Sequence, residues 1–123
     1  MRRSTHSRSE AEKRGRRGEA VAAWWLRLTG WRVLARRVKV PVGEVDLVAR
    51  RGRTVAFVEV KWRRDAAALG TAVDHWRLRR VARAAEAIAP RFARAGDSLR
   101  IDVILIAPRC WPRRIANAWQ PGA

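Results

Sequence analysis

The alternation of apolar and polar residues divides the chain into two helices and five strands. Apolar residues recur at helical spacing in two segments, and the segments between and after them alternate with a period of two. Thr29-Gly30 suits a left-handed helix cap, and Pro41 interrupts a strand. The helices are predicted at residues 10–28 and 73–89, and the strands at 31–40, 44–50, 54–62, 99–107 and 113–119.

This α-β-β-β-α-β-β order predicts an α/β fold with a mixed sheet flanked by helices. Residues 51–53 form a short turn, so the second and third strands are expected to pair as a hairpin around Gly52. Pro90 is expected to close the second helix, and the apolar strand at 99–107 is expected to be central. No repeat is visible, which indicates a single domain over 10–120 after a disordered basic arm at 1–9.

Length and composition exclude several classes of protein. With 123 residues, 48% of them hydrophobic, the chain has room for one core. Its longest apolar run, 20–26, is too short for a membrane span, and the N-terminus lacks the apolar stretch of a secretory signal, so a cytoplasmic location is expected. Cys110 has no disulfide partner, and with only His6 and His75 no usual zinc spacing exists. A metal would therefore use oxygen ligands, as hard cations do.

The charge of the chain points to nucleic acid. Lysine and arginine number 28 against 11 aspartate and glutamate residues, which gives a formal net charge of +17. A basic surface of this size attracts polyphosphates by releasing their counterions. Only three of the basic residues are lysines, so genome base composition is an alternative source of the excess. The seven tryptophans suit base stacking, although core packing is their commoner use.

Charged residues interrupt two adjacent apolar strands, in the runs Gly43-Glu44-Val45-Asp46-Leu47-Val48 and Phe57-Val58-Glu59-Val60-Lys61. Because side chains alternate along a strand, Glu44 and Asp46 are expected to share one face, as are Glu59 and Lys61. A turn around Gly52 pairs residues whose numbers sum to about 104, which puts Asp46 beside Glu59. The residues expected on the opposite faces, in the core, are Val45, Leu47, Val58 and Val60.

Two adjacent carboxylates in an apolar sheet repel each other unless a cation neutralises them. Mg²⁺ does so with one or two carboxylates, several waters and substrate phosphate oxygens, so Asp46 and Glu59 predict a site for Mg²⁺ or Mn²⁺. The ion would polarise a phosphodiester and activate a bound water, with Lys61 orienting that water or offsetting charge in the transition state. The alternative is that Glu59 and Lys61 form salt bridges on a solvated face.

The run Gly43-Glu44-Val45-Asp46-Leu47-Val48, followed after a turn by Phe57-Val58-Glu59-Val60-Lys61, resembles the bacterial YraN family of uncharacterised nuclease-like proteins. More distantly, it resembles the archaeal Holliday-junction resolvases. The resemblance implies the restriction-endonuclease-like fold and covers about residues 15 to 119. The chain departs from the family at Trp62, where a small polar residue is usual, and at Arg37, where asparagine is frequent. Further matching positions are Gly15, Gly18-Glu19, Ala22, Leu26, Gly30-Trp31 and Arg100-Ile101-Asp102-Val103.

The resemblance also implies roles for the residues of the two strands. Asp46 and Glu59 would hold the metal together with the backbone carbonyl of Val60, and Lys61 would be the catalytic lysine. Glu19 would be a further metal ligand at the edge of the site, directly or through water. Its alternative is an exposed glutamate in the first turn of a helix.

The remaining implied roles lie outside the metal ligands. Glu44 would either cap the motif or contact the groups that surround the metal. Asp102 is expected to pair with an arginine, and His75 to lie at the surface. The second helix would contact phosphates, unless it is only a solvated face, through Arg77, Arg79, Arg80 and Arg83.

Three functions compete at this level. The first is a metal-dependent endonuclease that hydrolyses phosphodiesters in structured or branched DNA. The second is a nucleic-acid-binding protein without turnover, with DNA favoured over RNA as the partner. The third is a structural partner in a repair or ribosome-associated complex. Junction cleavage would use two sites, which is consistent with a homodimer, although no motif in the sequence indicates one.

Overall fold

The computed structural model describes residues 2–64 and 75–119, with side chains from 15–64 and 76–119. The elements follow in the order α1 (Arg2–Leu28), β1 (Arg32–Val40), β2 (Gly43–Arg51), β3 (Thr54–Trp62), α2 (His75–Phe92), β4 (Ser98–Ile106) and β5 (Arg113–Ile115). The predicted α-β-β-β-α-β-β order is confirmed. The edges of β1 to β4 agree with prediction to within one residue, whereas β5 ends at Ile115 rather than at residue 119.

Both helices extend beyond their predicted ends. Helix α1 includes residues 2–9, for which a disordered arm was predicted, because helix propagation adds a hydrogen bond per residue and no glycine or proline stops it there. Helix α2 continues past Pro90, and Ala93 N–H donates to Ala89 O at 2.8 Å. A proline removes its own donor and crowds the carbonyl four residues earlier, which weakens a helix but leaves the donors of the residues after it available. The predicted start of α2 at 73–74 lies outside the described residues.

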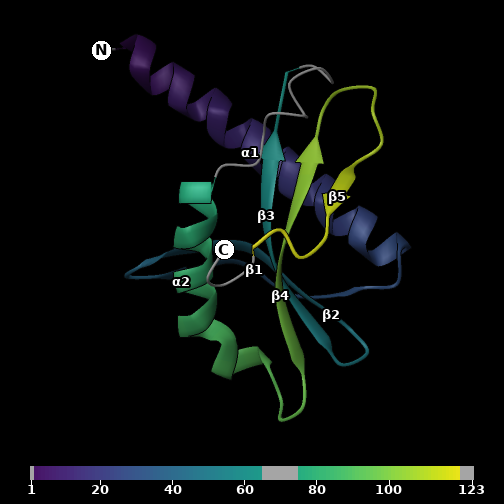
Figure 1. Cartoon of the computed structure of the whole chain (residues 1–123). Helices are drawn as coiled ribbons and strands as arrows, with labels where there is room; N and C mark the ends of the chain where they lie inside the picture. The colour runs from purple at the N-terminus through teal and green to yellow at the C-terminus, as the bar shows by residue number, and fades with distance from the viewer. Residues whose placement is uncertain (1, 65–74, 120–123) are drawn as a thin grey trace.

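The five strands form one sheet in the order β1-β2-β3-β4-β5. Strands β3 and β4 run parallel and are connected through α2, whereas all other neighbours in the sheet are antiparallel. Helix α1 covers one face of the sheet and α2 covers the other (Figure 1). The prediction of a mixed sheet flanked by helices is therefore confirmed.

Each helix buries an apolar stripe against its own face of the sheet. The stripe of α2 consists of Leu78, Val81, Ala84, Ala85, Ile88 and Ala89. The cluster beneath α1 is smaller and includes Ala22, Ala23, Leu26 and Trp31. Strand β4 contributes to both clusters, as expected of a central strand. Full burial of a large apolar side chain stabilises a fold by about 1.5–3 kcal/mol, so these stripes fix the two helices on the sheet.

Strand β2 departs from regular alternation around Asp46. Val45 and Val48 both belong to the cluster beneath α2, although residues three apart lie on opposite faces of a regular strand. Leu47 belongs to the cluster beneath α1, so the prediction that Val45 and Leu47 share a face is wrong. The irregularity coincides with a φ of 51° at Arg37, which the β1–β2 register places opposite Asp46. A residue in the left-handed region interrupts the pleat of a strand.

A buried ion-pair cluster ties β5 to the rest of the sheet. Asp102 on β4 is fully buried, and its carboxylate accepts hydrogen bonds from Arg100, Arg114 and the backbone N–H of Asn117. The two guanidinium groups also lie 5.1 and 5.5 Å from the centre of the Trp31 ring. The expected pairing of Asp102 with arginine is confirmed.

Within residues 2–64 and 75–119, no helix has the length and apolarity to cross a bilayer.

Candidate metal and nucleic-acid site

The carboxylate of Asp46 lies where β2 separates from β3. The ladder between the two strands ends at the pair Leu47–Val58, so Asp46 takes the next position, beside Glu59. There the Oδ2 of Asp46 accepts a hydrogen bond from the backbone N–H of Val60 at 2.8 Å. The side chain thus replaces a backbone acceptor and is held against β3 at the point where the sheet opens.

Glu59 and Lys61 are buried on β3, with relative exposures of 8% and 5%. Lys61 Nζ lies 3.1 Å from Glu59 Oε1, and Arg77 Nε approaches the same oxygen at 3.6 Å. The other oxygen, Glu59 Oε2, is buried and has no hydrogen-bond partner among the described residues. The alternative of a salt bridge between Glu59 and Lys61 is therefore realised for one oxygen only, and this salt bridge is not on a solvated face.

The two carboxylates open onto a cavity of about 320 Å³. Helix α1 contributes to one side of this cavity, and α2 contributes to another. The lining residues are Gly15, Glu19, Gly43, Glu44, Asp46, Glu59, Val60, Arg77, Arg80 and Val81. The cavity therefore combines acidic residues from the sheet and α1 with basic residues from α2, an arrangement that can accommodate a cation together with a phosphate group.

Burial and the neighbouring negative charges shift the pKa of Asp46. Burial raises the pKa of Asp46 from 3.8 to about 6, and the Val60 N–H partly opposes this. The carboxylates of Glu19, Glu59 and Glu44 raise the pKa further. On β3, burial lowers the pKa of the Lys61 ammonium below its ordinary value, a shift that Glu59 opposes. Both shifts follow from charges held away from water.

Glu19 reaches the cavity but is paired with another residue. Its Oε2 accepts a hydrogen bond from Arg37 Nε at 2.6 Å. Glu44 is exposed and lines the same cavity. Among the residues whose side chains are described, no three carboxylate, histidine or cysteine side chains form a ready-made metal-binding group. Two carboxylates and a backbone carbonyl would then need water or substrate oxygens to complete the coordination of Mg²⁺.

The four arginines predicted to bind phosphates fall into two pairs. Arg77 and Arg80 line the cavity. Arg79 and Arg83 are exposed on α2 and do not line it. The guanidinium of Arg80 also lies 5.5 Å from the ring centre of Trp76. The structure therefore brings half of the predicted set to the carboxylates.

Several residues at the site were missed by the sequence analysis. Gly43 passes close to α2, and a Cβ there would lie 3.3 Å from the Arg80 carbonyl oxygen. The turn-forming Pro41-Val42-Gly43 stretch was the available signal for this approach. Three basic residues of α1 and β1 were also missed, since only the fold brings them beside the acidic residues, in an adjoining cavity, namely Arg16, Arg37 and Lys39.

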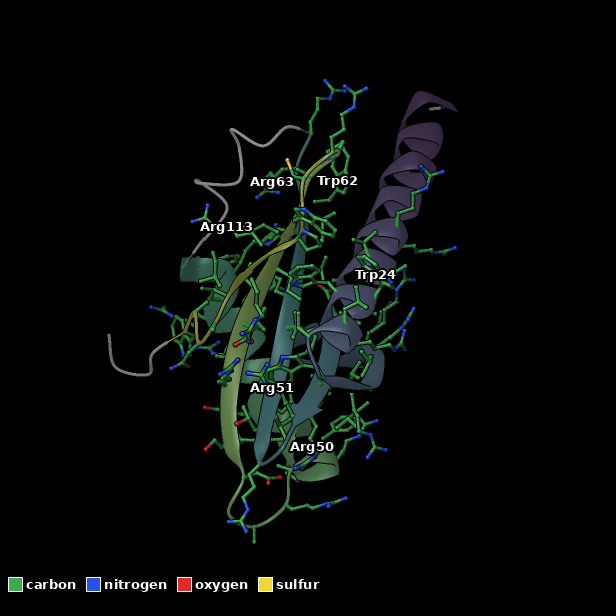
Figure 2. The ribbon with its side chains drawn as sticks, turned by 90° about the vertical axis from the view of Figure 1, so that its right-hand side faces the viewer. Trp24, Arg50, Arg51, Trp62, Arg63 and Arg113 are labelled. Atoms are coloured by element: carbon green, nitrogen blue, oxygen red, sulfur yellow. The ribbon has the colours of Figure 1, made fainter. Side chains whose placement is uncertain are left out.

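Trp62 does not obstruct this cavity. It packs with the cluster beneath α1, and a Cβ at Gly18 would lie 3.9 Å from it. Figure 2 shows Trp62 and Arg63 at the end of β3, far along the sheet from Arg50 and Arg51. Along β3, Val58 and Val60 point to the α1 side of the sheet. The residues that alternate with them, Glu59 and Lys61, therefore point to the other side. The departure at position 62 therefore leaves the carboxylates accessible.

Comparison with known proteins places these residues in a family. The model of the uncharacterised protein family UPF0102 matches residues 18–106. The chain belongs to this family. A UPF0102 protein of Sphingopyxis alaskensis is 66% identical over 115 residues, which cover 94% of this chain and 99% of the relative. A UPF0102 protein of Erythrobacter litoralis is 62% identical and covers 93% of this chain and 98% of the relative.

The fold of this UPF0102 protein is similar to that of a resolvase. The structure of Hjc from Archaeoglobus fulgidus, a Holliday junction resolvase, superposes with a TM-score of 0.57 and 21% identity. The superposition covers 83% of this chain and 76% of Hjc. The predicted resemblance to archaeal resolvases is thus confirmed for the fold. The residues Glu19, Asp46, Glu59 and Lys61 all lie within the segment that the UPF0102 model matches.

Proposed function

We propose that this protein is a metal-dependent endonuclease that hydrolyses phosphodiesters in structured or branched DNA. The observation that carries the proposal is the buried Glu59 Oε2, which has no hydrogen-bond partner among the described residues and lies in a cavity with Asp46. A buried carboxylate oxygen without a partner is costly. A divalent cation in the cavity would remove this cost.

The residues present fit Mg²⁺ or Mn²⁺. Asp46 and Glu59 supply carboxylate oxygens, and the Val60 carbonyl supplies a neutral one, all of the hard type that Mg²⁺ prefers. When bound, the ion would polarise the phosphodiester and lower the pKa of an attacking water. Burial lowers the pKa of the Lys61 ammonium, so the neutral amine, the form that can accept a proton from that water, is more accessible than in an exposed lysine.

Three features support nucleic acid, and DNA in particular, as the substrate. Arg77 and Arg80 line the same cavity as the carboxylates, where they can bind phosphate oxygens, and the chain has a net charge of +17. The fold is similar to that of a protein that resolves Holliday junctions, which favours branched DNA. Cleavage of both strands of a junction needs two sites, so a homodimer is part of the proposal.

The test is a cleavage assay with labelled linear, flapped and four-way DNA and with RNA, with and without Mg²⁺ or Mn²⁺. We expect metal-dependent cleavage of branched DNA that Glu59→Gln and Lys61→Met abolish. Glu86→Gln is the matched control, because Glu86 is an exposed glutamate on α2 that does not line the cavity. Cleavage that survives Glu59→Gln would overturn the proposed site.

A second function is favoured by the two ion pairs of Glu59. Lys61 and Arg77 together offset the charge of Glu59 in the absence of metal. A site that is partly neutralised in this way suits a nucleic-acid-binding protein without turnover, either alone or within a repair or ribosome-associated complex. Wild-type protein that binds DNA or RNA tightly but cuts none of the substrates in either metal would make this the better function.

A further inference from the structure

A second cavity adjoins the carboxylate cavity on the side of β1. Its volume is about 380 Å³, and it shares four lining residues with its neighbour: Gly15, Glu19, Glu44 and Asp46. The residues that belong to it alone are all basic, namely Arg16, Arg37 and Lys39. The acidic centre therefore has basic groups on two sides, with α2 on one and α1 with β1 on the other.

Arg37 adopts a backbone conformation that is uncommon outside glycine and that, among the described residues, Arg109 and Asn117 share. Its φ is 51°, in the left-handed region that favours glycine or asparagine and costs other residues about 1 kcal/mol or more. A glycine or an asparagine at position 37 would adopt this conformation at a lower cost. Backbone strain of this kind is found more often at functional sites than elsewhere. The tolerated strain suggests that the arginine side chain has a use at this position.

The side chain of Arg37 is directed to the acidic centre by Glu19. The only ion pair described for Arg37 joins its Nε to Glu19 Oε2 at 2.6 Å. This contact uses one of five guanidinium donors, and the planar fork of arginine matches two oxygens of a phosphate. The side chain of Arg37 is 38% exposed, so it can be reached by a ligand.

We propose that Arg37, with Arg16 and Lys39, forms a phosphate-binding subsite next to the carboxylate centre, and that Glu19 positions Arg37 for it. The ligand is a backbone phosphate of the nucleic acid, one that neighbours the phosphate bound between Asp46, Glu59 and α2. The assignment of that central phosphate rests on the proposed function. Phosphate is the fitting class because three cationic side chains line one cavity, and the three carboxylates that line it too belong to the proposed metal site, where a bound cation would offset their charge.

The test measures binding without cleavage. Fluorescein-labelled four-way DNA is titrated with the full-length protein in EDTA, and anisotropy is recorded at several salt concentrations. Arg37→Gln should weaken binding about tenfold and reduce the salt slope by about 0.9, the value for one phosphate contact. Arg36→Gln is the matched control, since Arg36 is an exposed neighbour on β1 that lines neither cavity. It should change affinity less than twofold.

Two further variants separate binding from folding. Arg37→Asn should weaken binding as Arg37→Gln does while leaving the melting temperature unchanged or higher, because asparagine tolerates a positive φ. Glu19→Gln should keep Arg37 in position, because the amide oxygen can still accept a hydrogen bond from Arg37 Nε, and should preserve or strengthen binding, because a negative charge beside the phosphate is removed. Equal losses for Arg37→Gln and Arg36→Gln, or a melting temperature of Arg37→Asn that falls together with its affinity, would overturn the subsite.

The outcome is independent of the catalytic test. If wild-type protein cuts no substrate but the Arg37 variants lose affinity, the proposed function fails and the subsite stands. If Glu59→Gln abolishes cleavage but Arg37→Gln binds as the wild type does, the subsite fails and the nuclease stands.

Discussion

The variant Asp46→Asn tests whether the charge of Asp46 destabilises the metal-free protein while being needed for metal binding. Asparagine has nearly the same shape as aspartate, and its Oδ1 can still accept the Val60 N–H that Asp46 Oδ2 accepts at 2.8 Å. The substitution therefore removes the charge and keeps the hydrogen bond that holds the side chain against β3. In the metal-free protein we expect the variant to be more stable than the wild type at neutral and higher pH.

The magnitude follows from the pKa of Asp46. Burial and the neighbouring carboxylates raise it from 3.8 to about 6 in the folded protein. A raised folded-state pKa contributes stability that is fully present below the unfolded pKa and is lost as pH rises through the folded pKa. At about 1.4 kcal/mol per unit, the wild type should lose up to about 3 kcal/mol between pH 4 and pH 7. For a domain of this size that corresponds to roughly 10 °C in melting temperature.

The assay is urea denaturation of both proteins in EDTA from pH 4 to pH 8. The quantity of interest is the difference between their free energies of unfolding, in which the titration of groups that do not interact with Asp46 cancels. Asp46→Asn should be comparable to the wild type near pH 4 and more stable by up to about 3 kcal/mol at pH 8. Glu86→Gln, at an exposed position of α2, should show no such trend.

A metal arm completes the experiment. At a concentration 100 times its dissociation constant, Mg²⁺ stabilises a folded protein by about 2.7 kcal/mol. Wild-type protein at pH 8 should gain stability with Mg²⁺, and the gain should shrink below pH 6 as Asp46 is protonated. Asp46→Asn should gain far less. A variant that is less stable than the wild type at every pH, by a constant amount, would refute the view that Asp46 is a desolvated carboxylate among like charges.

Two further predictions concern α2. Gly43→Ala should destabilise the protein by about 1 kcal/mol, measured by urea denaturation, because the added Cβ meets the backbone of Arg80 at 3.3 Å and the helix would have to shift. Replacing Arg77 and Arg80 together by alanine should weaken DNA binding and flatten its salt dependence, whereas the same change at Arg79 and Arg83 should have the smaller effect, measured by anisotropy titration. Equal effects of the two pairs would mean that the position of Arg77 and Arg80 in the cavity gives them no special role in DNA binding.

The sequence predicted the fold because its periodicities are local. The spacing of Leu78, Val81, Ala85 and Ile88 marked one face of α2, and the turn at Gly52 set the hairpin. What the sequence analysis missed came from outside that local pattern. Helix α1 extends through residues that have no apolar face, because hydrogen bonding propagates through sequence that lacks a hydrophobic signal. Helix α2 continues beyond Pro90 to Phe92, which packs against the cluster beneath α2.

The candidate site was predicted as far as regular strands allow. The expected hairpin register placed Asp46 beside Glu59. The alternation of side chains along β3 placed Lys61 on the same face as Glu59. It failed where β2 leaves the regular pattern, since it put Val45 and Leu47 on one face. The left-handed residue on the neighbouring strand that accompanies this change is an arginine, which carries no sequence signal for a positive φ. Long-range pairing therefore explains what local patterns could not.

Three unfavourable features meet at the place where β2 and β3 separate. Asp46 is an acid held away from water, Glu59 keeps a buried oxygen without a described partner, and Arg37 adopts a backbone conformation that suits glycine. Each could be relieved by a single conservative substitution, so packing alone gives no reason for any of them. They are independent in chemical origin, because one concerns charge, one hydrogen bonding and one backbone sterics. Their convergence on one pair of cavities, beside Lys61 and Arg77, supports the proposal that this place holds a cation and a phosphate.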